Sequence, residues 1–534
     1  MENQPVGKII EVDGNHLTAA LYDNATGISG NIGQVDTYLT VHQGDSRILV
    51  TIHRSWLKQE NGREISMINC MPLGEISSTD RFSAGLSNYP MTGAEVYSTT
   101  SEELKKIFLQ NAEFDFSLGH LRKHKDIPIY LNPSLLFGRH LAILGQSGSG
   151  KSWTVTSLIQ NTLKSMPNAH IILLDLHGEY CWKDQNDKLK AAFDSKQMRY
   201  VDVRSLEIPY WLLTYSELID LLIDRNDPGA PTQIAYLREV LKILRQDANK
   251  HLKIDRLSVD SPVYFSLKDM LLHFKKANEA QSDFGKTKGP LYGQFDEFLV
   301  KLQSKLNDAR YDFLFRPKRR RSSESLEDLL RDFSGLTDPK RQITVIDLSP
   351  IPSDIHPIVA SQLARLAFEF NYWNPKRSRF PIQLICEEAH AYIPRSNDPR
   401  FRGTRQAIER IAKEGRKYGV GLTVVTQRPH ELSETVLSQC SSYICMRLTN
   451  PDDQLYVRRL VPEGNEKLTD TLSALSRGEA LILGEAIPLS SRLQINLPDP
   501  PPNSNDADYF NNWKHDVEDI DVAEIVDHWR NQQR

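Results

Sequence analysis

Three things are scarce in this sequence: paired cysteines, long apolar runs and an excess of charge of one sign. The five cysteines form no CxxC pair, and no basic-then-apolar leader follows Met1, so we expect no disulfide framework and a reducing, cytoplasmic location. No apolar run approaches the roughly 18 residues that a membrane-spanning helix needs. The net charge of −4 over 534 residues gives no general attraction for nucleic acid or anionic membranes, so any DNA contact must use a local basic surface.

The first hundred residues contain short segments in which apolar and polar residues alternate, separated by turn residues. From Val6 to about Val96 these segments are GKIIEV, HLTAALY, TYLTVHQG, SRILVTIHRS and YPMTGAEVYS. Period-two segments at this spacing predict a small all-β domain, a barrel, over residues 1–100. A capped helical pattern, SEELKKIFLQNA with Ser101 before Glu103, predicts the boundary that follows.

The rest of the chain alternates strands with helices, which predicts an α/β fold class with a parallel sheet. A strand, loop, helix and strand succeed one another within residues 101–214, and strands resume over residues 339–496. Residues 215–338 carry helical patterns, so we predict one α/β core split by an inserted helical subdomain. A tail rich in proline and acidic residues, 497–534, follows the core, and its VAEIVDHWR segment predicts a short docking helix.

A glycine-rich motif links an apolar strand to an amphipathic helix. The segment GQSGSGKS, Gly145 to Ser152, matches the pattern G-x4-G-K-[ST]. In this context backbone N–H groups wrap phosphates, Lys151 reaches the β and γ oxygens, and Ser152 ligates Mg²⁺. The predicted nucleotide-binding residues are Gly145, Gln146, Ser147, Gly148, Ser149, Gly150, Lys151, Ser152 and Trp153. The alternative is a chance Gly/Ser turn before a helix.

Two adjacent carboxylates end another apolar strand in LICEEAHAYIPR, Leu384 to Arg395. An unpaired charge is costly at the end of a buried strand, so both acids need a partner. We predict that Glu387 helps to hold Mg²⁺ and that Glu388 orients and activates an attacking water. The alternative is a pair of acids stabilised only by the dipole of a helix start.

Gln427 follows the next apolar strand, GLTVVTQRP. A polar residue at the carboxyl end of a parallel strand faces the ligand crevice. We predict that Gln427 hydrogen-bonds the γ-phosphate or the water and reports the state of the nucleotide. A simple strand-ending cap is the alternative.

Basic residues gather between these two strands and outnumber the acids there. They are Arg395, Arg400, Arg402, Arg405, Arg410, Lys413, Arg416 and Lys417. Three interpretations stay open: contacts with nucleic-acid phosphates, an arginine inserted into a neighbouring subunit's nucleotide site, and a solvated helix face. A second basic run, RPKRRR at Arg316 to Arg321, predicts a mobile solvated loop rather than a specific contact.

Taken in order, these motifs resemble those of the HerA-type bacterial and archaeal ATPases, relatives of FtsK-like DNA pumps. The resemblance runs from about His120 to Asp453 and rests on GHL, RHLAILGQSGSGKSW, LLDLHGEY, LEIPYWLLTYSEL, DARYDFLF, EEAHAYIP, EGRKYGVGLTVVTQRP and CSSYICMRLTNPDD. It implies a RecA-like P-loop NTPase core behind a small barrel of the HAS type. It also implies a homohexamer that hydrolyses ATP with Mg²⁺ at subunit interfaces, with duplex DNA in its central channel. The long separation between Lys151 and Glu387, and the AYIPRSN that follows, exclude a DEAH-box helicase.

The resemblance further implies roles for single residues. These are Lys151 and Ser152 for phosphate and Mg²⁺, Glu388 as catalytic glutamate, Gln427 as sensor, and Arg416, with Arg428 and Arg447 as further candidates, as arginine finger. Asp175 and Glu179, in LLDLHGEY, match a family motif near the nucleotide, and the tail after Leu497 resembles a brace over a neighbouring subunit. The chain departs from the family at Glu387, where Asp is usual, so this longer side chain must shift Mg²⁺ or reach it through water.

Two functions follow from these features. One is an ATP-driven DNA translocase or helicase that works with a partner docked on the barrel. The partner expected is a NurA-type nuclease in DNA end processing, or a sirtuin-type NADase or other effector in antiphage defence. The other is an ATP-gated ring scaffold that assembles and regulates such an effector without unwinding DNA. A pump for conjugation or chromosome transfer would require membrane segments that this sequence lacks.

Overall fold

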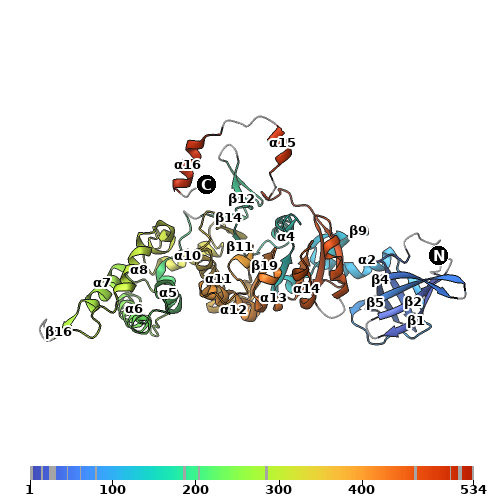
Figure 1. Ribbon diagram of the computed structural model, residues 1–534, viewed down its shortest axis with the longest axis horizontal. Helices are drawn as coiled ribbons and strands as arrows, with labels where there is room; N and C mark the ends of the chain where they lie inside the picture. The colour runs from blue at the N-terminus through green and yellow to red at the C-terminus, as the bar shows by residue number, and fades with distance from the viewer. Residues whose placement is uncertain are drawn as a thin grey trace.

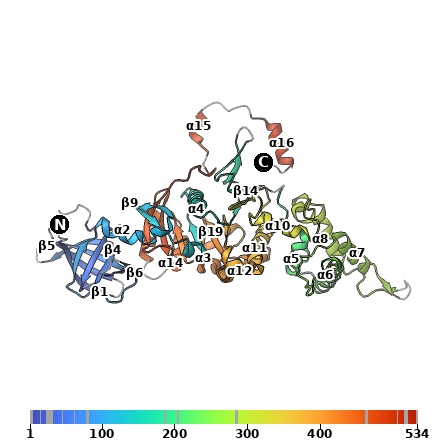
Figure 2. The ribbon, with the colours of Figure 1, turned by 180° about the vertical axis from the view of Figure 1, so that it is seen from behind.

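The computed structural model describes residues 4–13, 16–22, 32–44, 46–60, 62–77, 81–184, 188–202, 205–282, 287–461, 466–504, 507–514 and 520–531. Figure 1 shows three parts along the longest axis: a β-barrel near the N-terminus, a large sheet with helices in the middle, and a group of helices at the far end. Figure 2 shows the same order from behind, with the C-terminal segment arching above the middle part.

Among the described residues, six strands close the barrel that the alternating pattern predicts. They are β1 (Pro5–Asp13), β2 (His16–Leu21), β3 (Tyr38–Gln43), β4 (Ser46–Glu60), β5 (Arg63–Ile76) and β7 (Glu95–Ser98). Their order is β2-β1-β7-β3-β4-β5, and a further pairing of β2 with β5 closes the ring. The short strand β6 (Phe82–Ala84) pairs with the end of β5, on the edge away from β4. Inward side chains such as Leu39, Val41 and Ile68 give the barrel a core of its own.

The sequence pattern did not predict strand β5. Its register against β4 shifts at two points, so its apolar residues do not alternate, and Pro72 and Gly74 within it are residues typical of turns. The strand forms nonetheless because β4 and β2 pair with it on both sides. Tertiary pairing therefore overrides a weak local signal here.

Helix α2 (Ser101–Phe108) follows the barrel, and its N-cap lies one residue before the predicted cap, Ser101. The N-cap is Thr100: its Oγ1 accepts the N–H of Glu103, and the Glu103 carboxylate accepts the N–H of Thr100. Leu104 and Phe108 on α2 belong to one apolar cluster with barrel and sheet residues, so this helix joins the two parts.

The middle part is built on a sheet of 11 strands. In spatial order they are β14 (Met198–Val201), β17 (Ile343–Asp347), β11 (Ile171–Asp175), β18 (Ile382–Cys386), β19 (Val420–Thr426), β10 (Leu141–Leu144), β20 (Ser442–Cys445), β21 (Glu479–Gly484), β22 (Ser491–Ile495), β8 (Ser117–Leu121) and β9 (His124–Tyr130). The strands from β14 to β20 are parallel, as predicted, and β21 to β9 extend the sheet with antiparallel pairs. Every residue of β10, β11, β18 and β19 is buried, which fits a parallel sheet covered on both faces.

Helices cover both faces of this sheet. Leu141 and Ile143 of β10 share an apolar cluster with α4 (Lys151–Ser165), whereas Ala142 and Leu144 share one with α11 (His356–Trp373) and α12 (Arg402–Tyr418). Shorter helices are α3 (Pro133–Gly138), α13 (Glu434–Ser438) and α14 (Pro451–Leu460), and two small hairpins are β12 (Cys181–Lys183) with β13 (Leu189–Ala191) and β15 (Gln281–Ser282) with β16 (Thr287–Lys288). Alternate residues of a strand point to opposite faces, so α4 lies on one face and α11 and α12 on the other.

Helices also fill the sequence between two neighbouring strands of the sheet, β14 and β17. They are α5 (Tyr215–Leu222), α6 (Ala230–Leu252), α7 (Leu267–Asn278), α8 (Asp296–Asn307), α9 (Asp312–Phe315) and α10 (Ser325–Phe333). Their buried residues, such as Leu237 and Phe274, belong to the same apolar cluster as the α11 face of the sheet. The helices therefore pack against the sheet through a shared core.

Arg316, Lys318, Arg319 and Arg321 are exposed, as the predicted solvated loop requires, but the run also makes specific contacts that the sequence did not predict. Glu207 accepts the backbone N–H groups of Lys318, Arg319 and Arg320. The Arg320 side chain is only 11% exposed and pairs with Asp332. Composition suggested solvation, but a single carboxylate folds this run into a specific turn.

The C-terminal segment first runs past α4 and the turn after β11, and then extends away from the sheet. Gln160 of α4 bonds the backbone at Asp499 and Pro500, and the N–H of Asn503 donates to the carbonyl of Glu179 at 2.8 Å. Beyond it, α15 (Tyr509–Lys514) and α16 (Val522–Asn531) carry large exposed apolar side chains (Figure 1). Within the part of the chain described above, no helix has the length and apolar character to cross a membrane.

Candidate functional site

The predicted site residues meet at one edge of the sheet, where the parallel strands end. The N–H of Gly145, after β10, donates to the carbonyl of Thr426 at the end of β19. The N–H of Glu387, after β18, donates to Leu174 of β11. Because β19 lies between β10 and β18, Gln427 follows the strand that separates the glycine loop from the two glutamates.

The loop from Gly145 to Gly150 has a shape that only glycine permits at several points. Gly148 and Gly150 have φ of +72° and +105°, a region that side chains disfavour. A Cβ on Gly145 would lie 2.7 Å from Ser149 Oγ and 2.8 Å from Met446 Cβ. Helix α4 begins directly after this loop at Lys151, so its unpaired N–H groups and dipole point at the loop. This geometry is typical of a phosphate-binding cradle.

Lys151 is a buried cation at the base of this cradle. Its side chain is 8% exposed, and Nζ donates to the carbonyl of Gln146 at 3.2 Å. Burial lowers the pKa of Lys151, while the nearby carboxylates of Glu388, Glu387 and Glu179 act in the opposite direction. A buried ammonium among carboxylates is electrostatically matched to an anionic ligand such as a phosphate.

Glu387 points into the protein rather than toward solvent. It is 4% exposed, and the hydroxyl of Tyr180 donates to its Oε1. Burial raises the pKa of Glu387 well above its usual range, and the charges of Asp175 and Glu179 add to this. Burial of Glu387 beside other carboxylates therefore disfavours its charged form.

Asp175 shapes the turn that brings Glu179 and Tyr180 to the site. Its Oδ1 accepts the N–H groups of His177, Gly178 and Glu179, and its Oδ2 accepts the N–H of Tyr180 at 3.0 Å. Burial, with a contribution from Asp347, raises the pKa of Asp175 to about 7. No definite role for Asp175 could be predicted from the sequence. In the structure its carboxylate is the acceptor that organises this turn.

Glu388 differs from Glu387 in both backbone and environment. Its φ is +42°, uncommon for a residue with a side chain, and its side chain is 13% exposed. Oε2 of Glu388 is buried without a hydrogen-bond partner among the described residues, and His390 Nδ1 lies 3.3 Å away without hydrogen-bond geometry. A buried acceptor of this kind requires an external donor, such as water or a ligand.

The remaining loop and sensor residues lie where the motifs predict. Ser152 and Trp153 occupy the first turn of α4, both half-buried, and the Trp153 indole N–H has no partner within the described chain. Gln427 is half-buried just beyond β19. Gln146 links the loop to the segment after β20. Its N–H donates to the Arg447 carbonyl, and its Oε1 accepts two hydrogen bonds from Thr449.

The arginine-finger candidates do not all reach this edge. Arg416 lies at the opposite edge of the sheet, exposed, beside a cavity of about 150 Å³ that His170 and Pro381 also line. Arg428 is near the site but pairs with Glu431 at 2.8 Å. The structure therefore keeps Arg416 away from the phosphate loop of its own chain.

Most cations of the predicted basic cluster already have partners. Arg400 pairs with Asp398, Arg410 with Glu369 and Lys413 with Glu409, and Arg405 donates to Asn397 and Pro394. Across the described chain, no carboxylate forms an ion pair with Arg402, Arg416 or Lys417. The solvated-face interpretation therefore fits much of this cluster.

The donor set suits a nucleoside triphosphate with Mg²⁺. No group of three or more His, Cys, Asp or Glu side chains in the described residues forms a metal site. Mg²⁺ commonly binds through phosphate oxygens, waters and one or two protein oxygens, and needs no such cage. Ser152 and the two glutamates supply oxygens beside the cradle, so the residues present fit this pair of ligands.

Sequence reasoning missed three polar groups that shape the site. Tyr180 bonds Glu387, and the Thr426 hydroxyl lies 3.1 Å from Nδ1 of His390. In the sequence these groups are the tyrosine of HGEY, the histidine of EEAH and the threonine of TQRP. Each stands next to a motif residue, but the pairs join separate strands and only the fold brings them together.

Comparisons with known proteins relate this chain to helicases named HerA. The family profile described as "Helicase HerA, central domain" matches residues 116–367. The DNA double-strand break repair helicase HerA of Sulfolobus acidocaldarius is 28% identical over 459 residues, covering 82% of this chain and 80% of that protein. The helicase of the same name in Saccharolobus solfataricus is 27% identical over 442 residues, covering 81% and 78%.

Two solved structures align with this chain over most of their own length, with TM-scores below 0.5. VirB4 of Thermoanaerobacter pseudethanolicus gives a TM-score of 0.45 at 15% identity and covers 74% of this chain and 97% of that one. The plasmid coupling protein TrwB, in complex with the ATP analogue ADPNP, gives 0.45 at 14% identity and covers 75% and 93%.

Glu387→Gln should stabilise the nucleotide-free, Mg²⁺-free protein as pH rises. A carboxyl whose pKa is raised by folding contributes stability below its ordinary value of 4.5 and loses it as pH increases. Glutamine stays neutral, so the gain over the native chain should grow between pH 5 and pH 8, by on the order of 1 kcal/mol or more. Urea unfolding at both pH values measures it, with the exposed Glu239→Gln on α6 as control. An equal difference at both pH values would contradict a buried, uncharged Glu387.

Proposed function

We propose that this chain, which belongs to the HerA-type ATPase family, is an ATP-driven motor that acts on double-stranded DNA as a translocase or helicase. One observation carries the ATPase part: a glycine cradle, the buried Lys151 and a glutamate with an unpaired buried oxygen meet at one sheet edge. The DNA part is supported by the relatives, which are named DNA double-strand break repair helicases.

ATP hydrolysis would use each group of the site in a distinct way. The backbone N–H groups of the loop and the start of α4 bind phosphate oxygens, and Lys151 neutralises the β and γ oxygens. Glu388 accepts the proton of the attacking water through its unpaired oxygen, and Gln427 contacts the γ-phosphate or that water. Catalysis here is positioning and charge stabilisation rather than covalent chemistry.

Mg²⁺, when bound, would draw charge away from the transferring phosphate. We assign its protein ligands as Ser152 and Glu387. Glu387 is tied to Tyr180 and buried, so its contact is the weaker of the two assignments. A cation beside Glu387 would favour its charged form, the reverse of its state without ligand.

We further propose that the motor is a homohexameric ring with the arginine finger supplied in trans. Support comes from Arg416, which is exposed and lies at the edge opposite the phosphate loop, where a neighbouring subunit's site would meet it. Duplex DNA would pass through the central channel of this ring.

We propose that the chain divides into the barrel (1–100), an ATPase core in two parts (101–214 and 339–496), the helical insertion (215–338) and a C-terminal brace (497–534).

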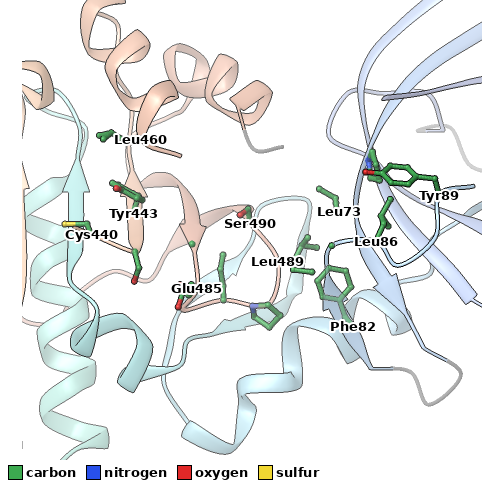
Figure 3. Close-up of a pocket in the computed structure, with 17 residues that line it drawn as sticks. Leu73, Phe82, Leu86, Tyr89, Cys440, Tyr443, Leu460, Glu485, Leu489 and Ser490 are labelled. Carbon is green, nitrogen blue, oxygen red and sulfur yellow. The ribbon is translucent and has the colours of Figure 1, made fainter. Parts of the chain in front are cut away.

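A partner would dock on the barrel side, away from the ATP edge. A groove of about 800 Å³ lies there between the barrel and the sheet. Figure 3 shows the residues that line it. Leu73, Phe82 and Leu86 line it from the barrel, and Tyr443 and Leu489 line it from the sheet. We propose a nuclease of the NurA type, or an NADase or other effector, as the occupant, in DNA end processing or antiphage defence.

The second candidate, an ATP-gated ring scaffold, rests on the same groove, since a partner between barrel and core would sense their relative position. The two functions differ in their response to DNA.

Lys151→Ala should lose ATP binding, because the cradle loses its buried cation, and Glu388→Gln should bind ATP but hydrolyse it at least 100-fold more slowly. Steady-state hydrolysis with and without linear duplex DNA checks this, with the exposed Lys417→Ala as control. Turnover that DNA does not stimulate would favour the scaffold, and turnover retained in Glu388→Gln would contradict the base assignment.

Arg416→Ala should lose hydrolysis and regain it in mixed rings. In a mixture with Lys151→Ala subunits, an intact phosphate loop of one subunit can meet an intact Arg416 of its neighbour, so activity should return. The measurement is ATPase activity across mixing ratios, with Arg402→Ala as a matched exposed arginine on the same helix. Inactive mixtures at every ratio would rule out Arg416 as a finger acting in trans.

A further inference from the structure

His390 lies in the turn after β18 and contacts two site residues at once. Its Nδ1 lies 3.3 Å from Glu388 Oε2 and 3.1 Å from Thr426 Oγ1. The His390 side chain is 16% exposed, and Thr426 is fully buried. The unusual backbone of Glu388, at φ +42°, aims its carboxylate toward this pair, and such a conformation persists only where the surroundings hold it.

The hydrogen bonds indicate which form of the His390 ring the site holds. Thr426 Oγ1 already accepts the backbone N–H of Arg428 at 3.1 Å, so its own hydrogen is available to donate to Nδ1 of His390. The contact between Nδ1 and Glu388 lacks hydrogen-bond geometry, and Glu388 Oε2 has no partner in the described chain. This arrangement fits a neutral imidazole with its proton on Nε2.

Charged groups from every neighbouring element act on His390. Glu388 in the same turn and Glu431 after β19 favour the imidazolium, whereas Arg428 and Lys151 oppose it. Burial has the largest effect, so the pKa of His390 lies below its ordinary value. The neutral ring inferred from the hydrogen bonds is thus also the electrostatically favoured one.

We propose that His390 is a positioning residue that decides whether Glu388 can act as a base. The neutral ring accepts the Thr426 hydroxyl and leaves Glu388 Oε2 free, whereas the imidazolium pairs with Glu388 and withdraws it. This inference rests on the proposed ATP hydrolysis and adds a proton-dependent control to the same site.

The control acts on one proton transfer. In the hydrolytic step the water oxygen bonds to the γ-phosphorus, the bond to the bridging oxygen breaks with its electron pair left on ADP, and the water proton passes to Glu388 Oε2. An imidazolium 3.3 Å from this oxygen pairs with its negative charge and competes with the water for it, so the oxygen becomes a poorer proton acceptor. Turnover therefore falls as His390 takes up a proton, while ATP binding does not follow the same pH dependence.

The first test measures the pKa of His390 directly in the full-length protein. Deuterium exchange at the ring carbon between the two nitrogens, followed by mass spectrometry across pH, gives this value without any turnover. Thr426→Val removes the hydroxyl that stabilises the neutral ring, so the pKa of His390 should rise by about half a unit or more. Thr426→Ser keeps the hydroxyl and is the matched control, with a pKa like that of the native chain. Equal pKa values in the valine and serine variants would overturn the inference.

The second test is the pH profile of ATP hydrolysis. The acid side of the native kcat profile should follow the measured pKa of His390 and move to higher pH in Thr426→Val. His390→Asn keeps a polar atom near the Nδ1 position but does not titrate, so this component of the profile should vanish while KM for ATP stays within about two-fold. A kcat lowered by one factor at all pH values, with the profile unchanged, would mean a purely structural histidine and overturn the inference.

The two tests separate this inference from the proposed function. An ordinary pKa for His390 overturns the inference even in an active ATPase. Absence of turnover in the native chain at every pH contradicts the proposed function, and the inference with it, even where the exchange measurement gives the expected pKa.

Discussion

The whole site depends on the concentration of buried charge where the parallel strands end. The ammonium group of Lys151 is buried near several carboxylates. Burial disfavours charged carboxylates, and those at this end of the sheet differ in their hydrogen bonds. Asp175 accepts four backbone N–H groups, Glu387 takes the Tyr180 hydroxyl, and Glu388 keeps one oxygen unpaired. The unpaired oxygen of Glu388 needs a hydrogen-bond donor, such as a water held beside a bound phosphate, because the protein alone leaves this acceptor unsatisfied.

The adjacent residues Glu387 and Glu388, which follow β18, differ in backbone conformation and in surroundings. Glu387 continues the direction of β18 into the interior, whereas the left-handed backbone of Glu388 turns its side chain toward the glycine loop and His390. The sequence predicted different roles for the two acids but not their different surroundings, which depend on the positive φ of Glu388 and on Tyr180 from the turn after β11. The longer side chain at position 387 is accommodated by that tyrosine.

Local signals predicted the elements that carry the chemistry. The glycine loop, the buried strands and the closed barrel follow from motif spacing and from apolar periodicity. Strand β5, the antiparallel extension of the sheet and the turn around Glu207 did not, because each depends on a partner distant in sequence. The His390 and Thr426 pair belongs to this second class, since it joins two strands through side chains alone.

Arg416 lies away from the phosphate loop of its own chain, so its proposed role as arginine finger requires a neighbouring subunit. The account's central claim is that Glu388, not Glu387, faces the reacting phosphate. An experimental structure of the assembled protein with Mg²⁺ and a non-hydrolysable ATP analogue tests it most directly. We predict Glu388 Oε2 within hydrogen-bond distance of a water in line with the γ-phosphate, and Glu387 still bonded to Tyr180 or to the metal shell. A water held by Glu387, with Glu388 turned away, would contradict the account.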